Sequence, residues 1–324
     1  MSEKKITSIG GQAVIEGVMM RGPFKTCVSV RKPDGEITEK ITENTVKGGF
    51  RKIPILRGIF GFVNSMVIGI NALMFSAQFY EEDGTPKEDA GPKPEFEEAD
   101  KETKEEKKKE ESGELSGFAL FITLFTSIAL SVGLFFVLPN LIAGGITDAV
   151  NVESKDVFYN VIESVVKIAI FLGYLTLVSQ MKDIKRVFEY HGAEHKTIFC
   201  YENGEELTVE NVKKFKRFHP RCGTSFLLFV VIISIIVYTI VGRNPNPFLN
   251  IGIRIALLPL IAGFSYEIIR FAGKHSDNKF ISWLNQPGMW LQRLTTREPD
   301  DTQIECAIHS LKAVIPEDQK ADIW

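Results

Sequence analysis

Apolar residues are gathered in long blocks along this 324-residue chain, and most charged residues lie between the blocks. A helix needs about 20 apolar residues, each adding about 1.5 Å, to cross the hydrocarbon of a bilayer. Blocks of about that length, rich in Ile, Leu, Val and Phe, occupy Phe118–Leu138, Val157–Ser179, Ser225–Val241 with its flanks, and Ile251–Ile269. The pattern therefore predicts a mainly α, polytopic membrane protein with four transmembrane helices.

Residues 53–80 form a further apolar segment, which is rich in glycine and is interrupted by Arg57, Asn64, Asn71 and Gln78. If this segment crossed the membrane, the basic N-terminal region would lie outside the cell, against the positive-inside tendency. We therefore expect a re-entrant or interfacial helical segment that returns to the cytosol, with a fifth span as the alternative.

Polar and apolar positions alternate in residues 1–52, which is typical of strands. Cys27–Val30 and Glu36–Thr38 flank the turn sequence Lys32–Gly35, so we expect a hairpin within a small cytosolic β element. Residues 81–115 are dominated by Glu, Asp, Lys, Pro and Gly. That composition cannot bury a core, and we expect a disordered linker.

Two helices are expected after the last span. Ile281–Leu294 contains Trp283 and Trp290, which suit a helix on the membrane surface. A capping box formed by Thr302 and Glu305 predicts the start of an amphipathic cytosolic helix. Its apolar face consists of Ile304, Ala307, Ile308, Leu311 and Ile315.

The orientation of the chain follows from its basic residues. The loop between the second and third spans carries nine Lys and Arg, whereas the loops on the other side offer Lys155 and Arg243. This places the loop, both termini and the linker in the cytosol. The expected parts are a β segment (1–52), a re-entrant or interfacial helix (53–80), a linker (81–115), two spans (116–180), a His/Cys loop (181–223), two further spans (224–272) and interfacial and amphipathic helices (273–324).

Composition adds three expectations. The N-terminal sequence MSEKKITSIGG lacks an apolar core, so it does not resemble a cleavable signal peptide, and the internal spans must direct insertion. The formal net charge is −3, and we expect no nucleic-acid partner. The four cysteines all fall in segments placed in the cytosol, where thiols stay reduced. They are Cys27, Cys200, Cys222 and Cys306.

The most specific chemical pattern is Tyr190–Lys196, with the sequence YHGAEHK. On a helix, His191 and His195 lie one turn apart and point the same way, so they can bind one metal ion. Glu194 lies beside them and can take a proton from water. The pattern matches the H-x-x-E-H arrangement of inverted zinc peptidases. The alternative is a pair of interfacial histidines bound to backbone or lipid phosphate.

Three residues are candidates for a third metal ligand. His219 and Cys222 directly precede the third span, at the same membrane face as the histidine helix. Glu267 lies near the cytosolic end of the fourth span, where ionisable residues are costly and are usually functional or paired. A pair between Glu267 and Arg270 is the alternative. Three ligands would leave a coordination position for water.

A second conspicuous segment is Gly10–Pro23, where closely spaced glycines allow another surface to approach the backbone. Gln12, Glu16 and Arg21 add polar and charged groups, but no phosphate-loop motif is present. The segment is either an active-site loop or a structural turn. His275 and His309 look like ordinary polar residues.

Four segments together closely resemble one family: GGQAVIEGVMMRGP, YHGAEHKTIFCYENGEELTVENV, HPRCGTSF and QRLTTREPDDTQIECAI. It is the bacterial YqhQ-like family of membrane proteins, and the resemblance runs from about Ile9 to about Ile315. It implies a metal-dependent enzyme of unknown function in the bacterial inner (cytoplasmic) membrane, and it brings no substrate. The motif positions that it marks are Glu16, Arg21, His191, Glu194, His195, His219, Arg221, Cys222, Glu267, Arg297 and Glu298.

Two functions follow from these patterns. The first is a zinc-dependent hydrolase at the cytosolic membrane interface, in which His191 and His195 hold a divalent metal, expected to be Zn²⁺, and Glu194 is the catalytic base. The second is a non-enzymatic scaffold or accessory factor for membrane-protein assembly, whose basic loop and acidic linker bind a membrane-protein partner. A transporter is a third option, weakened by the low polarity expected inside the spans. The lipid bilayer is a partner in every case.

Overall fold

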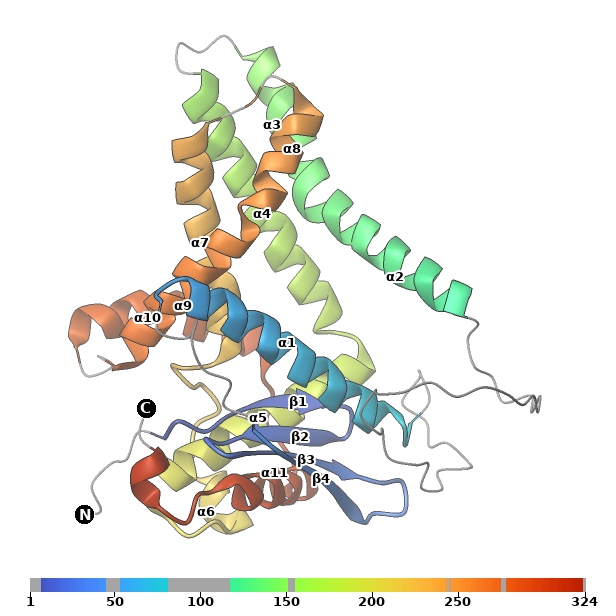
Figure 1. Cartoon of the computed structure of the whole chain (residues 1–324), viewed down its shortest axis with the longest axis vertical. Coiled ribbons are helices and arrows are strands. Elements are labelled where there is room, and N and C mark those ends of the chain that lie inside the picture. The colour runs from blue at the N-terminus through green and yellow to red at the C-terminus, as the bar shows by residue number, and fades with distance from the viewer. Residues whose placement is uncertain are drawn as a thin grey trace.

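The computed structural model describes residues 7–44, 53–80, 117–150, 155–242, 244, 246–274 and 278–322. A small sheet and its covering helices form one end of the molecule, and long helices extend away from them (Figure 1). We call the end of the long helices nearest the sheet the base of the bundle. The expected hydrophobic segments and the small β element are therefore both present.

The sheet is an antiparallel meander of four strands in the order β1-β2-β3-β4. The expected hairpin is confirmed, because β3 pairs with β4. The glycine-rich segment supplies the other two strands. Gly17 is required at its place, because a Cβ there would lie 2.3 Å from the carbonyl oxygen of Ser29. The strands span β1 Gly10–Val14, β2 Gly17–Arg21, β3 Lys25–Arg31 and β4 Ile37–Glu43.

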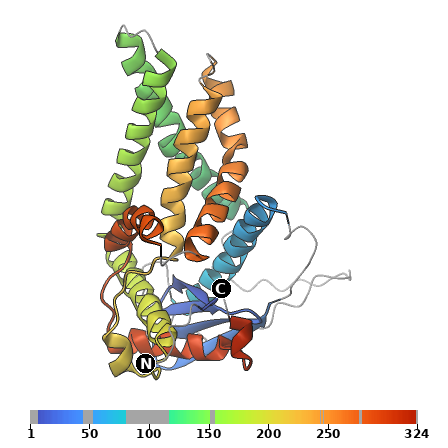
Figure 2. The same ribbon diagram turned by 90° about the vertical axis from the view of Figure 1, so that its left-hand side faces the viewer.

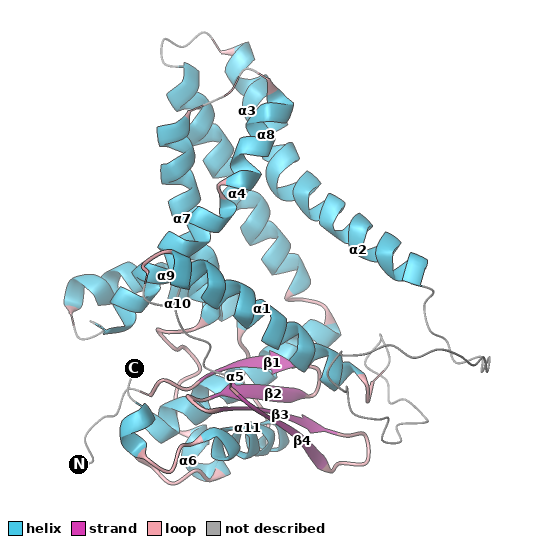
Figure 3. Cartoon of the chain, in the orientation of Figure 1, coloured by secondary structure: helices cyan, strands magenta, loops and turns pink. Residues whose placement is uncertain are grey.

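Helices cover both faces of this sheet (Figure 3). Successive strand residues face opposite sides, so Val18 and Met20 of β2 pack on one face and Met19 on the other. The first face is covered by α5 (Lys182–Glu202) and α11 (Asp301–Val314), with the short α6 (Val209–Lys213) beside them. The second face is covered by α1 (Leu56–Ala77). The sheet is thus the middle layer of three.

By length and composition, five helical segments among the described residues could cross a membrane: Leu56–Ala77, Phe125–Ala149, Val157–Val178, Gly223–Val241 and Phe248–Ala272. They are built from α1, α2 (Gly117–Val132), η2 (a π-helix, Gly133–Val137), α3 (Leu138–Ala149), α4 (Lys155–Val178), α7 (Gly223–Val241), α8 (Pro247–Ala256) and α9 (Leu258–Lys274). Apolar side chains such as Ile240 and Leu177 are largely exposed on them, as lipid contact requires.

Two boundaries differ from the sequence predictions. The first apolar span continues to Ala149 through the π-helix and α3, so most of the connection expected between Leu138 and Val157 is helical. Pro139 lies at the second residue of α3, just after the π-helix. The cap of α11 also lies earlier than expected. Asp300 is the N-cap and Gln303 completes the capping box, in place of Thr302 and Glu305.

Helix α1 is oblique to the bundle and lies between its base and the sheet (Figures 1 and 2). It packs against α9, where a Cβ at Gly58 would come within 2.9 Å of the carbonyl oxygen of Gly263. It also packs against β1, where a Cβ at Gly69 would meet Oε1 of Gln12 at 2.3 Å. The helix expected in residues 53–80 is therefore confirmed, and glycines on it allow both close contacts.

Helix α10 (Lys279–Thr295) packs against α7, and its Trp283 and Trp290 are exposed. Gly288 allows the contact, because a Cβ there would lie 2.6 Å from Oγ of Ser225. Exposed tryptophans beside the apolar helices fit the expected surface helix.

The interior of the bundle is more polar than expected. Arg254 of α8 and Glu163 of α4 form an ion pair with distances of 2.7 and 2.6 Å, and both are almost completely buried. Lys167 lies 3.5 Å from Glu163 and over the ring of Tyr238. The expectation of little polarity inside the spans was wrong, because these charges are diluted within long apolar segments of the sequence.

Candidate metal centre

The two histidines of the H-x-x-E-H pattern lie on α5, as the sequence predicted. Their ring centroids are 4.4 Å apart. Tyr190 and Ala193 on the same helix are buried against the sheet and α11, which fixes the rotation of α5 and turns the histidines toward the segments that flank α7 and α10. The segment that follows α10 lies in close contact with α5. This contact requires glycine at position 192, because a Cβ there would lie 1.9 Å from the carbonyl oxygen of Arg297.

Among the described residues, one group of His, Cys and acidic side chains has ligand atoms close enough for a single ion. It consists of His191, His195 and Cys222, whose ligand atoms all lie within 4.8 Å of one another. Nε2 of His191 lies 3.2 Å from Sγ of Cys222. Cys222 is the N-cap of α7, and its sulphur accepts a hydrogen bond from the backbone of Thr224.

Hydrogen bonds fix how each imidazole presents its nitrogens. Nδ1 of His191 lies 2.7 Å from the carbonyl oxygen of Thr295, and Nδ1 of His195 bonds to the carbonyl oxygen of Arg217. A carbonyl can only accept, so Nδ1 carries the hydrogen and Nε2 of a neutral ring keeps its lone pair. Nε2 of His195 is buried with no hydrogen-bond partner among the described residues. Metal-binding histidines are normally held in this way.

The environment favours the ligand forms of two of these groups. Burial lowers the pKa of His195, which keeps the imidazole neutral. Burial is the largest influence on Cys222 and would raise its pKa, but the interactions with His195 and the hydrogen bonds with Thr224 together outweigh burial, and the pKa of the thiol is lowered. Metal ligation needs neutral imidazole and thiolate. Two nitrogens and one sulphur form a donor set that suits Zn²⁺. The residues present therefore fit a divalent metal ion.

Glu194 lies beside this group and is buried. Its Oε2 has no hydrogen-bond partner among the described residues. Burial raises the pKa of Glu194 to about 7, although His191 and the backbone N–H of Gly11 act to lower it. Strand β1 closes over the carboxyl, because a Cβ at Gly11 would lie 2.9 Å from Cγ of Glu194. A buried carboxyl with such a pKa can both accept and donate a proton near neutral pH.

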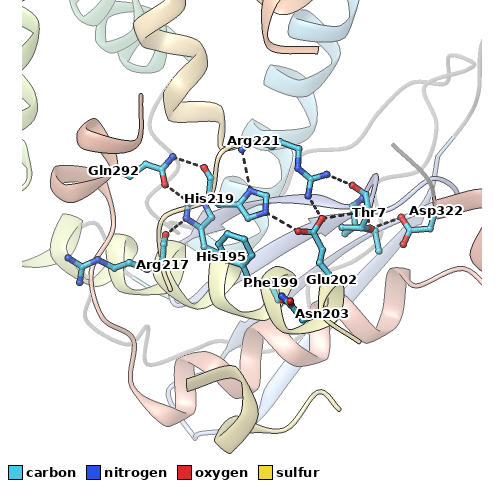
Figure 4. A network of polar contacts seen from close by, with 11 residues as sticks. Thr7, His195, Phe199, Glu202, Asn203, Arg217, His219, Arg221, Gln292 and Asp322 are labelled. Carbon is cyan, nitrogen blue, oxygen red and sulfur yellow. Dashed lines mark hydrogen bonds and ion pairs between the residues drawn. The ribbon is translucent and has the colours of Figure 1, made fainter. Parts of the chain in front are cut away.

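His219, another candidate ligand, lies behind His195 and belongs to a separate network (Figure 4). Its Nε2 is 3.5 Å from Oε2 of Glu202, and its backbone exchanges two hydrogen bonds of 2.7 Å with the side chain of Gln292. Arg221 bonds to Glu202 and to the carbonyl oxygen of Thr7. This network fixes the segment that carries Cys222.

The remaining candidate ligand, Glu267, is bound to Arg57 of α1 through Nε at 2.7 Å. The backbone N–H of Ile55 approaches the same carboxylate at 3.4 Å. Glu267 lies outside the group formed by His191, His195 and Cys222, and it connects α9 to α1.

The other motif positions connect elements around the centre. Glu16, in the turn between β1 and β2, accepts hydrogen bonds from Arg186 of α5. Glu298 pairs with Lys196. Arg297 donates to the carbonyl oxygen of Ser179 at 3.0 Å. Arg21 lines a cavity beside the sheet. His275 lies outside the described residues.

Sequence patterns did not reveal two features of the site. The carbonyl oxygens that orient the histidines could not be found, because every residue has one and only the fold selects those of Thr295 and Arg217. Two adjoining cavities beside Cys222 and Gly11 were also missed, although the unusual glycines of residues 10–23 were a signal of close packing there.

Comparison with known proteins identifies relatives with no assigned activity. Residues 53–317 match a family model described as a protein of unknown function (DUF1385). The chain is also similar to "Uncharacterized protein YqhQ" from Bacillus subtilis (strain 168), with 37% identity over 319 residues, covering 97% of this chain and 95% of that protein. No solved structure matches the chain significantly.

Proposed function

The chain belongs to the DUF1385 family of proteins of unknown function, and we propose that it is a metal-dependent hydrolase that works at a membrane surface. One observation carries this proposal. Ligand atoms of His191, His195 and Cys222 converge, while each histidine is oriented by a carbonyl oxygen at its Nδ1. A buried carboxyl, Glu194, lies beside them.

In this proposal the three converging atoms would hold a divalent ion, with Zn²⁺ as the expected metal. When bound, the ion supplies Lewis acidity, which polarises a substrate oxygen and makes water a stronger nucleophile near neutral pH. Glu194 takes the proton of the attacking water and returns it to the leaving group. Strand β1, through Gly11, covers Glu194 and limits its contact with bulk water.

We propose that the sheet and both termini lie on the cytosolic side of a bacterial inner membrane. The nine basic residues between α4 and α7 support this orientation. Four helical segments would cross the membrane, and α1 would be interfacial or re-entrant. Its packing against both β1 and α9 supports that position. The metal centre would then face substrates at the interface, such as a lipid headgroup or a peptide.

The test is metal analysis of the purified full-length protein. The wild type should contain a stoichiometric divalent metal, and His195→Ala should lose it, because two remaining ligands are too few for a stable site. His309→Ala is a matched control, because His309 is exposed and pairs with Glu39 at the surface. A wild type that binds no divalent metal, or equal metal in both variants, would contradict the proposal.

The scaffold hypothesis has less direct support. It needs charges of the basic loop to bind a partner, but several of them already have partners within the chain. Lys196 pairs with Glu298, Lys213 pairs with Asp301, and Arg217 lies 3.6 Å from Glu298.

A further inference from the structure

An apolar cavity of about 480 Å³ lies between α1, α7 and α9. Phe62 of α1 and Phe226 of α7, whose ring centroids are 5.4 Å apart, form part of its wall, and most of the remaining wall is also hydrocarbon. The volume is within the range of about 300–1,000 Å³ that is usual for small-molecule sites. The cavity can therefore hold an apolar ligand of moderate size.

One side of this cavity reaches the apolar exterior of the molecule. Met66, Ile70 and Leu73 of α1 line the cavity and are also exposed. They belong to a helical segment that is apolar enough to cross a membrane and that is proposed to lie at or in the bilayer. A ligand can therefore enter the cavity from the hydrocarbon of the bilayer without passing through water.

Another part of the cavity wall belongs to the candidate metal centre. Cys222 and Gly223 both line the cavity. A Cβ added at Gly223 would meet no atom of the described chain within 4 Å, so the space beside the metal-binding cysteine is open. A ligand that enters from the bilayer can thus extend to the metal centre.

A second cavity adjoins the first and differs from it in polarity. It has a volume of about 770 Å³ and a wall of mixed polar and apolar groups, including Asn64 and Ser8. The two cavities share four residues of their walls, which are Gln12, Gly61, Ser65 and Tyr266. Apolar space and polar space therefore meet close to the strand that covers Glu194.

We propose that the apolar cavity binds one hydrocarbon chain of a membrane lipid. The chain lies along α1, and the bond that joins it to the polar part of the lipid lies beside Cys222. A hydrocarbon chain needs no hydrogen bonds, so an apolar wall leaves no polar group of the chain unpaired. The polar part of the lipid occupies the second cavity. The proposed hydrolase then has an acyl lipid as its substrate class, a conclusion that rests on the proposed function.

An apolar peptide fits this cavity less well. An extended peptide would bring backbone N–H and C=O groups against a mainly apolar wall, where unpaired polar groups are costly. A helix satisfies these groups internally, but one helical turn about 10 Å wide and 5.4 Å long already fills about 420 Å³. The cavity would hold little more than one such turn, whereas a flexible hydrocarbon chain can follow its shape.

Native mass spectrometry of the purified full-length protein tests the assignment of the cavity. The probe is a lysophosphatidylcholine analogue whose single hexadecyl chain is attached through an ether bond, which a hydrolase does not cleave. Wild type should retain this lipid at least about tenfold more than glycerophosphocholine, which has the same headgroup and no chain. It should also retain the lipid at least about tenfold more than the uncharged peptide acetyl-tetraleucine amide.

Matched variants separate the cavity from the general apolar surface. A Cβ at Gly61 would meet only the ring of Tyr266, at ordinary contact distances of 3.7 and 3.8 Å, so Gly61→Leu should fold and place its side chain at the cavity wall. It should retain at least about tenfold less lipid. Gly173→Leu on α4, where a Cβ would meet no described atom within 4 Å, should retain as much as wild type.

A second pair of variants repeats the comparison at exposed positions. Ile70→Trp should fill the apolar cavity and reduce retention, whereas Ile128→Trp on α2 should not. The assignment is overturned if wild type retains the lipid and glycerophosphocholine equally, or if each variant and its control have equal effects. Equal retention of the leucine peptide would overturn it in favour of a peptide ligand.

The ester-linked lipid of the same chain length tests the substrate assignment. Water adds to the acyl carbon, the bond to the glycerol oxygen breaks, and that oxygen takes a proton, which releases a fatty acid and glycerophosphocholine. Metal-loaded wild type should release the fatty acid, and Gly61→Leu should release it at least about tenfold more slowly. Retention of the ether lipid without release of fatty acid from the ester would refute the substrate assignment.

Lipid retention and metal content are measured separately, so the cavity assignment and the proposed function can fail independently. His195→Ala should lose metal and still retain the ether lipid. Gly61→Leu should lose the lipid and keep metal. A wild type that contains metal but does not retain the lipid would refute the cavity assignment alone.

Discussion

Gly192→Ala should disturb the metal centre without touching a ligand. The added methyl would lie 1.9 Å from the carbonyl oxygen of Arg297, and such contacts need at least 3.0 Å, so α5 and the segment around Arg297 must separate by about 1 Å. His191 directly precedes Gly192 on α5, and its Nδ1 bonds to the carbonyl oxygen of Thr295, two residues before Arg297. Metal–ligand distances tolerate only about 0.2 Å, so the shift must weaken binding.

We expect zinc affinity to fall by about 10–100-fold, the range typical when groups that orient metal ligands are changed. Overpacking should cost about 1–3 kcal/mol of folding free energy, offset by about 1 kcal/mol because alanine favours helix more than glycine. Zinc affinity is measured by competition with a chromogenic chelator, and stability by thermal unfolding in detergent.

The matched control is Gly173→Ala on α4, where a Cβ would meet nothing within 4 Å. This variant should keep wild-type zinc affinity and should not lose stability. Wild-type zinc affinity in Gly192→Ala would refute the inference that contact between α5 and the segment at Arg297 positions His191.

Three further predictions concern other parts of the molecule. Glu194→Gln should keep its metal and lose about 10²–10⁴-fold in hydrolytic rate; full complementation of a deletion strain by this variant would contradict its role as a base. Glu163→Gln should lower the free energy of unfolding by about 3–5 kcal/mol, because it leaves Arg254 and Lys167 as buried cations without their carboxylate. Arg254→Gln should lower it less, because Glu163 keeps Lys167 at 3.5 Å; the reverse order in thermal unfolding would count against this account. In intact cells, an impermeant maleimide should label Val150→Cys and not Glu205→Cys, since the four native cysteines are buried and the second position is proposed to be cytosolic; labelling at position 205 would reverse the orientation.

Local patterns predicted the elements of the fold better than the contacts between them. The spacing of His191 and His195 defined a shared helical face, which needs no information from the rest of the chain. The choice among His219, Cys222 and Glu267 could not be made locally, because it depends on how α7 and α9 pack at the base of the bundle. For Glu267, sequence proximity favoured Arg270, but its closest partner is Arg57, 210 residues away.

Strand β2 was hidden for a related reason. Val18 and Met20 are buried on one face of the sheet and Met19 on the other, because helices cover both faces. A strand buried on both faces lacks the alternation of polar and apolar residues that identifies a half-exposed strand. The glycines indicated close packing, but only the fold shows that Gly11 approaches Glu194.

The site depends on both ends of the described chain. Thr7, just before β1, donates a 2.6 Å hydrogen bond to Asp322, which also accepts from Tyr201 of α5 at 2.9 Å. The carbonyl oxygen of Thr7 accepts from Arg221, the neighbour of Cys222. The N-terminal strand, the histidine helix, the start of α7 and the C-terminal segment are thus fixed to one another. The ligand atoms of the metal centre come from α5 and from the start of α7, and the carbonyl oxygens that orient the histidines belong to Thr295 and Arg217 outside these two elements. The centre can therefore form only after these segments have assembled at the base of the bundle.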